Sequence, residues 1–595
     1  MIFGLVSDAL GDAELAGHLP DRAEPARWQR WRGEGAALAC ELDDAPAALT
    51  GFPFAEDGLV VAARGRLDNL AELADALGLE RAGSPARVLL AGYRRWLREL
   101  GAHLLGDFAI ALVEPRTRTL CLIRDRLGVT PLYYARGDWG VAWSCSARAL
   151  TRLPFVSSAV DEARAASYLV GLSPDPNASF FREVRAVAPG HAVTLRAGGA
   201  ARRRYWFPAA EPELRLTEGE YAEEFRARFV RAVARCTAGT DRVAATLSGG
   251  LDSSSIACAA SLLLGKQVDS FSAVFPEFPS CDEREYIEAN VAAARLRPTY
   301  TDMSAFDLPT PEMIAGKVDS LETLAWYAIA YAQCLRARES GHRVILFGSF
   351  GDLVGGGAHT AVDELFARRA WLALARVGAR RELRANIRTA GRLFGQEVFP
   401  RGVEWYRRRA AECQLRERFP GLRYLSGTPR EIRELRDEAI RLDSARPSSR
   451  VALHHLELLT SPAAAQEFRV IADVERLAQV TGRHPFVDAE LLDWSLRLPL
   501  EARHENGHNR WALRSAMRDV VPDAVRLRRD KTDFIPYWSS LRAGWLDRPS
   551  PLVQPSRPSR RPGNLPELRV ASWELRARWA YGTVLLWTAE SEARP

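Results

Sequence analysis

Hydrophobic positions in the first 150 residues follow two different periods. Alternating or continuous apolar runs predict strands at 59–63, 108–113 and 120–123. Apolar residues spaced three and four apart predict helices at 70–77 and 86–100. Short strands with a few helices indicate a mixed α and β domain in this part of the chain.

Beyond residue 218 the pattern changes to strands that alternate with helices. The predicted order is helix 221–236, strand 243–247, helix 254–264, strand 270–275, helix 282–296 and strand 344–347. Such alternation is typical of a parallel, doubly wound α/β sheet. Residues 360–500 show almost only helical spacing. We therefore expect an α/β fold with a large helical region.

A polar stretch at 209–218 separates the two patterns and predicts a linker. The expected domains are 1–208 and 209–595. Near the C-terminus, residues 547–564 are rich in Pro, Ser and Arg, and an amphipathic pattern resumes at 566–587.

Composition narrows the class of protein. Of the 595 residues, 47% are hydrophobic and 26% are charged, which excludes a largely disordered or fibrous chain. No apolar run approaches the length of a membrane span, and the first ten residues lack the basic start of a secretory signal. The 8 cysteines form no CxxC pair, so neither a zinc site nor a disulfide framework is expected. A reducing, cytoplasmic compartment fits this usage.

The positive charge comes almost entirely from arginine. The net charge is +6, and lysine occurs only at Lys266, Lys317 and Lys531. The arginines are spread widely and lie near Asp or Glu, so a nucleic-acid-binding stripe is not expected. A lysine retained against this bias is more informative than another arginine.

A glycine- and serine-rich segment follows the predicted strand 243–247 and opens the next helix. It reads Thr246-Leu247-Ser248-Gly249-Gly250-Leu251-Asp252-Ser253-Ser254. Close backbone approach, hydroxyl groups and helix N-terminal amides favour an anion, so the segment is typical of a phosphate-binding loop. Asp252 would repel phosphate without a cation, and Mg²⁺ suits a carboxylate beside phosphate oxygens. The alternative is a turn that only caps the helix.

This segment resembles the pyrophosphate loop of the ATP pyrophosphatase superfamily (the PP-loop, adenine nucleotide α-hydrolase-like fold), and in particular that of the asparagine synthetase family. The likeness covers nearly the whole chain. Residues 105–112 and 124–134 are similar to the family's Ntn-hydrolase-like, glutaminase-type domain, and residues 483–488 and 513–514 to its C-terminal helical region. The resemblance implies ATP binding, AMP transfer to a carboxylate and pyrophosphate release. The nucleotide contacts it implies are Leu247, Ser248, Gly249, Gly250, Asp252, Ser253, Ser254, Val274, Gly348 and Ser349.

A second glycine-rich loop follows the predicted strand 344–347. Residues 348–356 are similar to the family loop in which an Asp helps to hold magnesium, and Asp352 falls on that Asp. Loops at the carboxyl ends of neighbouring parallel strands share one crevice, so Asp252 and Asp352 are predicted to share Mg²⁺. Leu353 stands where asparagine synthetases usually have Glu, which peptide-cyclising and ring-closing relatives also lack. A helix cap is the alternative role for Asp352.

The segment Arg528-Arg529-Asp530-Lys531 is similar to the family's R-x-x-K motif. This resemblance makes Lys531 the candidate catalytic residue. Its ammonium would stabilise negative charge on the α-phosphate during adenylation and on the oxyanion during amine attack. A solvated lysine at a helix end is the alternative.

The N-terminal domain is expected to be catalytically inactive. Active glutaminases of this type use the residue after the initiator Met, a cysteine, as nucleophile, and this chain has Ile2, which offers no nucleophilic atom. Arg64-Gly65-Arg66-Leu67-Asp68-Asn69 replaces the Asn-Gly-Glu that glutamine binding requires in the family. We expect a degenerate domain with a scaffolding role.

Three kinds of relative fit such a chain: lasso peptide cyclases, which use the peptide's own N-terminal amine, β-lactam synthetases, and ammonia-dependent asparagine synthetase-like proteins. The length of the chain and the runs 363–371 and 507–514 resemble lasso peptide cyclases. The expected reaction joins an Asp or Glu side chain of a precursor core peptide to its N-terminal amine, with ATP and Mg²⁺. A leader peptidase and a leader-recognition protein are implied partners. A non-catalytic binding protein is a further alternative, which the retention of Asp252, Asp352 and Lys531 disfavours.

Overall fold

The computed structural model describes residues 1–356 and 450–546, apart from the short stretches 8, 20–27, 42–44, 46, 81–82, 162–174, 197–198, 209–211, 310–313, 315, 321–322 and 506–507. Most of the predicted helical region, the run 363–371 and the stretches 547–564 and 566–587 lie outside the described residues. No helix among those that are described is long and apolar enough to cross a bilayer.

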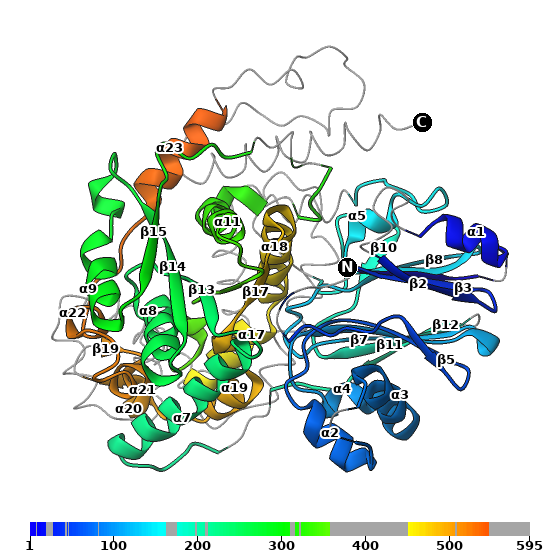
Figure 1. Cartoon of the computed structure of the whole chain (residues 1–595), viewed down its shortest axis with the longest axis horizontal. Coiled ribbons are helices and arrows are strands. Elements are labelled where there is room, and N and C mark those ends of the chain that lie inside the picture. The colour runs from blue at the N-terminus through cyan, green and yellow to red at the C-terminus, as the bar shows by residue number, and fades with distance from the viewer. Residues whose placement is uncertain are drawn as a thin grey trace, which may run out of the picture.

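The N-terminal half contains two antiparallel sheets of six strands each, stacked face to face (Figure 1). The first sheet has the order β10 (Val184–Ala186), β8 (Tyr133–Gly137), β9 (Gly140–Ser144), β1 (Ile2–Val6), β3 (Ala36–Glu41) and β2 (Trp28–Gly33). The second has the order β12 (Gly199–Arg204), β11 (His191–Arg196), β7 (Thr119–Arg124), β6 (Phe108–Glu114), β5 (Leu59–Gly65) and β4 (Phe54–Glu56).

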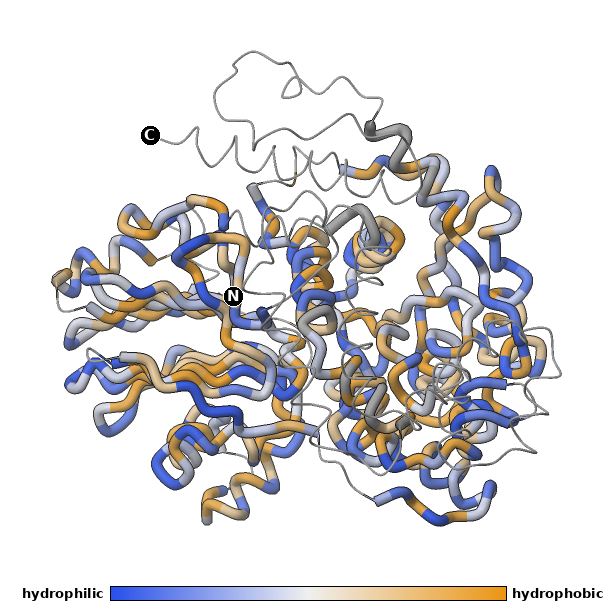
Figure 2. The backbone as a smooth tube through the Cα atoms, turned by 180° about the vertical axis from the view of Figure 1, so that it is seen from behind, coloured by the Kyte–Doolittle hydropathy of each residue, from blue (hydrophilic) through white to orange (hydrophobic). Residues whose placement is uncertain are grey.

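Alternation along the strands builds the core between these sheets. In β1, Ile2 and Val6 belong to the cluster that joins both sheets, whereas Phe3 and Leu5 belong to a separate cluster on the outer face. This is the period of two that a pleated strand imposes. From behind, the stacked strands are hydrophobic in their middle and hydrophilic at the turns (Figure 2). Helices cover the outer faces: α2 (Leu70–Leu77), α3 (Pro85–Trp96) and α4 (Leu100–His103) on one side, α1 (Asp12–Gly17) and α5 (Ala147–Leu150) on the other.

The second half is built on a five-stranded sheet in which all neighbours are parallel. Its order is β15 (Arg297–Asp302), β14 (Gln267–Val274), β13 (Arg242–Thr246), β16 (Val344–Leu346) and β17 (Thr481–Arg483). The predicted parallel sheet is therefore confirmed. The chain moves outward from β13 in one direction and then returns to β16 on its other side, which is where ligands bind in open α/β sheets.

Helices lie on both faces of this sheet (Figure 1). Within the described residues, the helices before and between its strands are α7 (Glu218–Cys236), α8 (Leu251–Cys258), α9 (Arg284–Ala294), α11 (Thr323–Glu339), α17 (Arg450–Thr460) and α18 (Pro462–Ala478). In the described part of the chain after β17 they are α19 (Ala489–Ser495), α20 (Leu500–Arg503), α21 (Trp511–Ala516), α22 (Asp523–Arg526) and α23 (Ile535–Leu546). A two-strand ribbon of β18 (His504–Glu505) and β19 (His508–Asn509) precedes α21.

The two halves meet through a buried polar cluster around Asp319. Its carboxylate accepts hydrogen bonds from the Ser146 hydroxyl at 3.0 Å and the Arg148 backbone N–H at 2.7 Å, both from the N-terminal half. Arg476 of α18 donates to the same carboxylate at 3.1 Å. Arg469, also on α18, donates to the Ala178 carbonyl at 2.7 Å. Helix α18, which belongs to the second half, is therefore also hydrogen-bonded to the N-terminal half.

Candidate active site

Two glycine-rich loops meet at the carboxyl edge of the parallel sheet. The loops follow β13 and β16, which pair with each other at Ala245 and Leu346. A Cβ atom at Gly348 would lie 2.7 Å from the Ser253 backbone nitrogen, and one at Gly351 would lie 2.3 Å from the Asp252 carboxyl carbon. Only glycine permits this approach, so the sequence of the second loop brings its backbone against the first.

The first loop leaves the start of α8 open. Gly250 precedes the helix and has no side chain with which to cap it, so the first-turn amides face the loop, where they favour an anion. The Ser248 backbone N–H donates to the Ser253 hydroxyl at 3.1 Å, which shapes the turn.

Three of the residues predicted to contact the nucleotide are buried in the protein interior. Leu247 is completely buried in the core, and Val274 is the buried last residue of β14. Ser254 is also completely buried, and its hydroxyl accepts a hydrogen bond from Asn290 of α9 at 3.0 Å. The structure thus places Ser248, Gly249, Gly250, Gly348 and Ser349 in the two loops and Ser253 in the first turn of α8, whereas the Ser254 hydroxyl points toward α9.

Asp252 and Asp352 lie beside one cation, the guanidinium of Arg510. Arg510 Nη1 donates to Asp252 Oδ2 at 2.5 Å and lies 3.1 Å from Asp352 Oδ1. Lys531 approaches from outside, with Nζ 3.3 Å from Asp352 Oδ2. The structure therefore gathers the two predicted metal ligands and the predicted catalytic lysine, although 258 positions separate Asp252 from Arg510.

The electrostatics of this group follow from burial and charge. Burial raises the pKa of Asp252, and the neighbouring Asp352 carboxylate adds to that rise while Arg510 opposes it. Burial alone would lower the pKa of Arg510, but the Asp252 and Asp352 carboxylates raise it. The positive charge on Arg510 and the negative charges on the two carboxylates therefore stabilise one another.

Glu283 anchors the loop that carries Lys531. Its Oε1 accepts hydrogen bonds from Arg528 Nη1 at 2.7 Å and from the Thr532 hydroxyl at 2.6 Å. The Arg528 guanidinium also lies over the Tyr286 ring, 3.9 Å from its centre. The residues on both sides of Lys531 are thus fixed to the start of α9, whereas Lys531 itself is 85% exposed.

These residues fit a magnesium-bound nucleotide. Two carboxylates converge on a single cation, and the open helix start faces the same loops. The described residues contain no group of three or more His, Cys, Asp or Glu side chains that could hold a metal ion alone. A divalent ion at this point would therefore complete its ligands with phosphate oxygens and water, as Mg²⁺ does in nucleotide sites.

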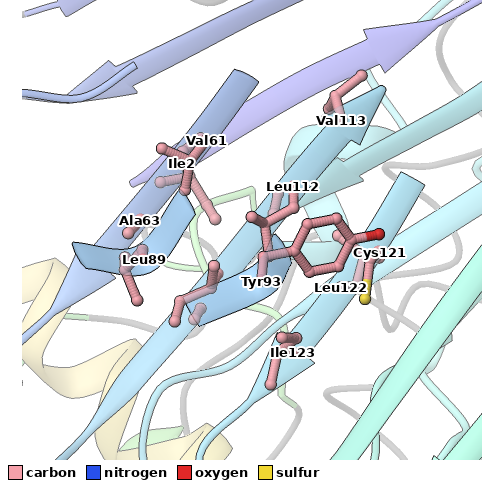
Figure 3. Close-up of a cluster of buried hydrophobic side chains, with 14 of the residues drawn as sticks. Ile2, Val61, Ala63, Leu89, Tyr93, Leu112, Val113, Cys121, Leu122 and Ile123 are labelled. Atoms are coloured by element: carbon pink, nitrogen blue, oxygen red, sulfur yellow. The ribbon is translucent and has the colours of Figure 1, made fainter. Parts of the chain in front are cut away.

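The residues of the N-terminal half that the sequence singled out are Ile2 and the segment 64–69. Ile2 is completely buried among the hydrophobic residues between the two sheets, where Figure 3 shows it beside Val61. Arg66 is ion-paired with Asp68 and, at 2.8 Å, with Asp107. These three side chains line a cavity between the two halves, together with Arg235 and Asp488.

Sequence reasoning missed two members of the site. Arg510 lies in the run 507–514, but a single arginine carries little information among so many. Glu283 lies at the start of a polar, ordinary-looking helix. What identifies Glu283 is its hydrogen bond with Arg528, which is 245 positions away. A contact over that distance leaves no pattern in the local sequence.

Comparison with known proteins agrees with this arrangement. The asparagine synthase family model matches residues 224–556, and the glutamine amidotransferase domain model matches residues 44–206. A putative glutamine-hydrolyzing asparagine synthetase of Mycobacterium tuberculosis is 28% identical over 528 residues, which is 83% of this chain and 78% of that protein. Glutamine-hydrolyzing asparagine synthetase 3 of Bacillus subtilis is 32% identical over 29% of this chain and 28% of its own. Carboxyethyl-arginine β-lactam-synthase of Streptomyces clavuligerus is 27% identical over 44% of this chain and 48% of its own.

Proposed function

The chain belongs to the asparagine synthase family, and from this premise we propose that it closes a macrolactam ring in a lasso peptide precursor with ATP. Homologues in the family are ATP-dependent ligases that form amide bonds, and this chain is an enzyme of that class. The observation that carries the finer proposal is the combination of a gathered synthetase-type site with an N-terminal domain in which Ile2 is completely buried.

The source of the amine distinguishes the possible reactions. Ile2 has no nucleophilic atom to attack glutamine. Arg66 is ion-paired with Asp68 and Asp107, in the segment that replaces the Asn-Gly-Glu expected for glutamine binding. We therefore propose that the substrate itself supplies the attacking amine, which is the N-terminal amine of the core peptide.

The proposed reaction balances as two displacements. A carboxylate oxygen of the precursor's Asp or Glu bonds to the α-phosphorus of ATP, and pyrophosphate leaves. The N-terminal amine then bonds to the acyl carbon, AMP leaves, and the amine loses a proton. Magnesium would neutralise the phosphates, held by Asp252 and Asp352.

The residues of the chain have separate roles in this proposal. The ammonium of Lys531 stabilises negative charge first at the α-phosphate and then at the oxyanion, because its exposed side chain can move between them. The amides at the start of α8 orient phosphate oxygens. Glu283 keeps the Lys531 loop in place. The leader peptidase and the leader-recognition protein are proposed partners on the same basis as the substrate.

A direct test uses the purified chain, a leader-free precursor peptide, ATP and Mg²⁺. We expect AMP, pyrophosphate and a peptide lighter by one water, and no product when the acceptor Asp or Glu of the peptide is replaced. Formation of ADP in place of AMP would exclude adenylation.

Ring closure of a small amino acid derivative is the second candidate, favoured by the similarity to carboxyethyl-arginine β-lactam-synthase. Ammonia-dependent amidation is the third, favoured by the similarity to proteins named asparagine synthetase. AMP formation that requires a small amino acid or free ammonia, and not the peptide, would support one of these and contradict the peptide substrate.

A further inference from the structure

Arg510 is directed into the site by its own backbone. Its φ angle is 60°, in the left-handed region that arginine adopts infrequently, and it directly precedes α21. Only 13% of the side chain is exposed. Its Nε is buried and makes no hydrogen bond, so within the described residues the polar contacts of the guanidinium concentrate on the two carboxylates.

The carboxylates need a positive charge at this point. Like charges within a few ångströms oppose each other's ionisation unless a cation lies between them. Lys531 contributes less than Arg510, because it is 85% exposed and, among the described residues, forms an ion pair with Asp352 at 3.3 Å but not with Asp252. Arg510 contacts both carboxylates through one nitrogen, so both lie close enough to share one ion.

We propose that Arg510 is an internal counter-ion that a divalent cation must displace. The proposal rests on the proposed function, because Asp252 and Asp352 are the metal-binding carboxylates of that reaction. A metal ion that arrives alone must separate a buried guanidinium from two carboxylates and leave it without an anion. A metal ion that arrives with a triphosphate brings another anion for the displaced guanidinium.

Arg510 therefore couples the two binding events. Because of Arg510, the site binds the metal ion together with the nucleotide more readily than it binds the metal ion alone. Its role is that of a positioning residue with a thermodynamic consequence: it holds the carboxylates ready while the site contains no nucleotide. The same displacement would bring a planar, multi-donor cation to the phosphates, a shape that suits phosphate oxygens.

The test is the affinity for Mn²⁺ alone, measured by electron paramagnetic resonance of the free ion without any nucleotide. We expect the full-length wild-type chain to bind weakly and Arg510→Gln to bind at least about tenfold more tightly, because the competing charge is gone. The added affinity should disappear in Arg510→Gln/Asp252→Asn. Equal Mn²⁺ affinity in wild type and Arg510→Gln would overturn the proposal.

A matched control separates this effect from a general change in charge. Arg518 is exposed and lies two residues beyond α21, so Arg518→Gln should leave Mn²⁺ binding unchanged, and an equal gain in that variant would overturn the proposal. If Arg510→Gln does not fold, Arg510→Lys decides: a gain of about threefold supports the proposal, because one ammonium bridges two carboxylates less well, and no gain overturns it. None of these measurements needs turnover, so a failed ring-closure assay and a failed counter-ion proposal are different results.

Discussion

Lys531 is the residue on which the proposed chemistry depends most directly. We expect Lys531→Ala to lower ring closure by about 10²–10³-fold, the usual cost of removing one group that stabilises the negative charge of a transition state. Lys531→Arg should also be poor, because a planar fork does not reproduce a compact ammonium. Quantifying AMP and the cyclised peptide checks both. The half-buried Lys266, which pairs with Asp241 away from the site, offers the control Lys266→Ala, which should remain active.

Glu283 should affect ring closure indirectly, by holding the segment around Lys531 in place. Glu283→Gln weakens two hydrogen bonds to the carboxylate, one of them from a charged guanidinium, that fix Arg528 and Thr532 on either side of Lys531. We expect kcat to fall by about tenfold or more while nucleotide affinity changes little, as measured by steady-state kinetics and calorimetry. Glu285→Gln, on an exposed position of the same helix, should have no effect. An unchanged kcat in Glu283→Gln would contradict the anchoring role.

Asp473 makes stability depend on pH. It is buried and accepts backbone N–H bonds from Asp319 and Ser320 at 3.0 and 2.8 Å. Burial raises the pKa of Asp473 to about 7, the Asp319 carboxylate adds to the rise, and Arg476 opposes it. The pKa of an Asp carboxyl in an unfolded chain is about 3.9, so folding takes up a proton at pH values between this and the folded pKa. This group's contribution to stability therefore falls as pH rises from about 4 to about 7.

The measurement is Tm at pH 5 and pH 7. We expect Tm to decline less between these values in Asp473→Asn than in wild type, although the variant is less stable overall because it disturbs the pairing with Arg476. Asp519→Asn, at an exposed position, should follow wild type. Parallel declines in all three proteins would contradict the prediction.

At this scale the sequence indicates chemistry but not geometry. Asp252, Asp352 and Lys531 stand out because glycine-rich loops and a rare lysine mark them. Arg510 and Glu283 do not, because their importance comes from contacts with residues more than 240 positions away. Long-range ion pairs have no local pattern to reveal them.

At the scale of the element, helix α7 begins with a reciprocal cap. The Thr217 hydroxyl accepts from the Glu220 backbone N–H at 3.3 Å, and the Glu220 carboxylate accepts from the Thr217 backbone N–H at 2.7 Å. Thr217→Ala should lower stability by about 1 kcal/mol and leave activity intact. Thermal unfolding beside Glu223→Ala, an exposed position within the helix, checks this. Equal Tm values for the two variants would contradict the importance of the cap.

Hydrophobic spacing predicted most elements closely, and its errors have physical causes. The helix predicted at 70–77 is α2, with the same bounds. The helix predicted at 86–100 is interrupted at Leu97, whose φ is 52°, and the chain continues as short helical turns. The helix predicted from 254 begins at Leu251, because the glycine-rich loop is shorter than its small residues suggest. The spacing of apolar residues locates the buried face of a helix, but it does not show at which residue the helix begins or ends.

At the scale of the whole molecule, the N-terminal half shares a hydrophobic core and a polar cluster with the other half. Leu127 belongs to the hydrophobic core of the parallel-sheet half, and Asp319 is bound from both sides. We expect deletion of residues 1–205 to give an insoluble or inactive protein, because it exposes these apolar and polar groups together. A soluble and fully active truncation, assayed for AMP formation, would contradict the scaffolding role.

The same half should not hydrolyse glutamine. With Ile2 buried and Arg66 ion-paired, the intact chain should release no glutamate from glutamine above background. An enzyme-coupled glutamate assay on pure protein measures this, and sustained release would contradict it.

The contacts between the two halves could not be predicted from the sequence, because Ser146 and Asp319 are 173 positions apart.

The separation of Asp252 from Arg510 also sets an order in time on the ribosome. At about 5–20 residues per second, the 258 positions between them take about 13–50 seconds to synthesise. Throughout that interval Asp252 has been synthesised and its guanidinium partner has not, while the strands of both antiparallel sheets have already been translated. The nascent chain therefore contains the whole sequence of the N-terminal sheets before it can form a complete nucleotide pocket. Ribosome stalling between these positions would leave a chain without Arg510.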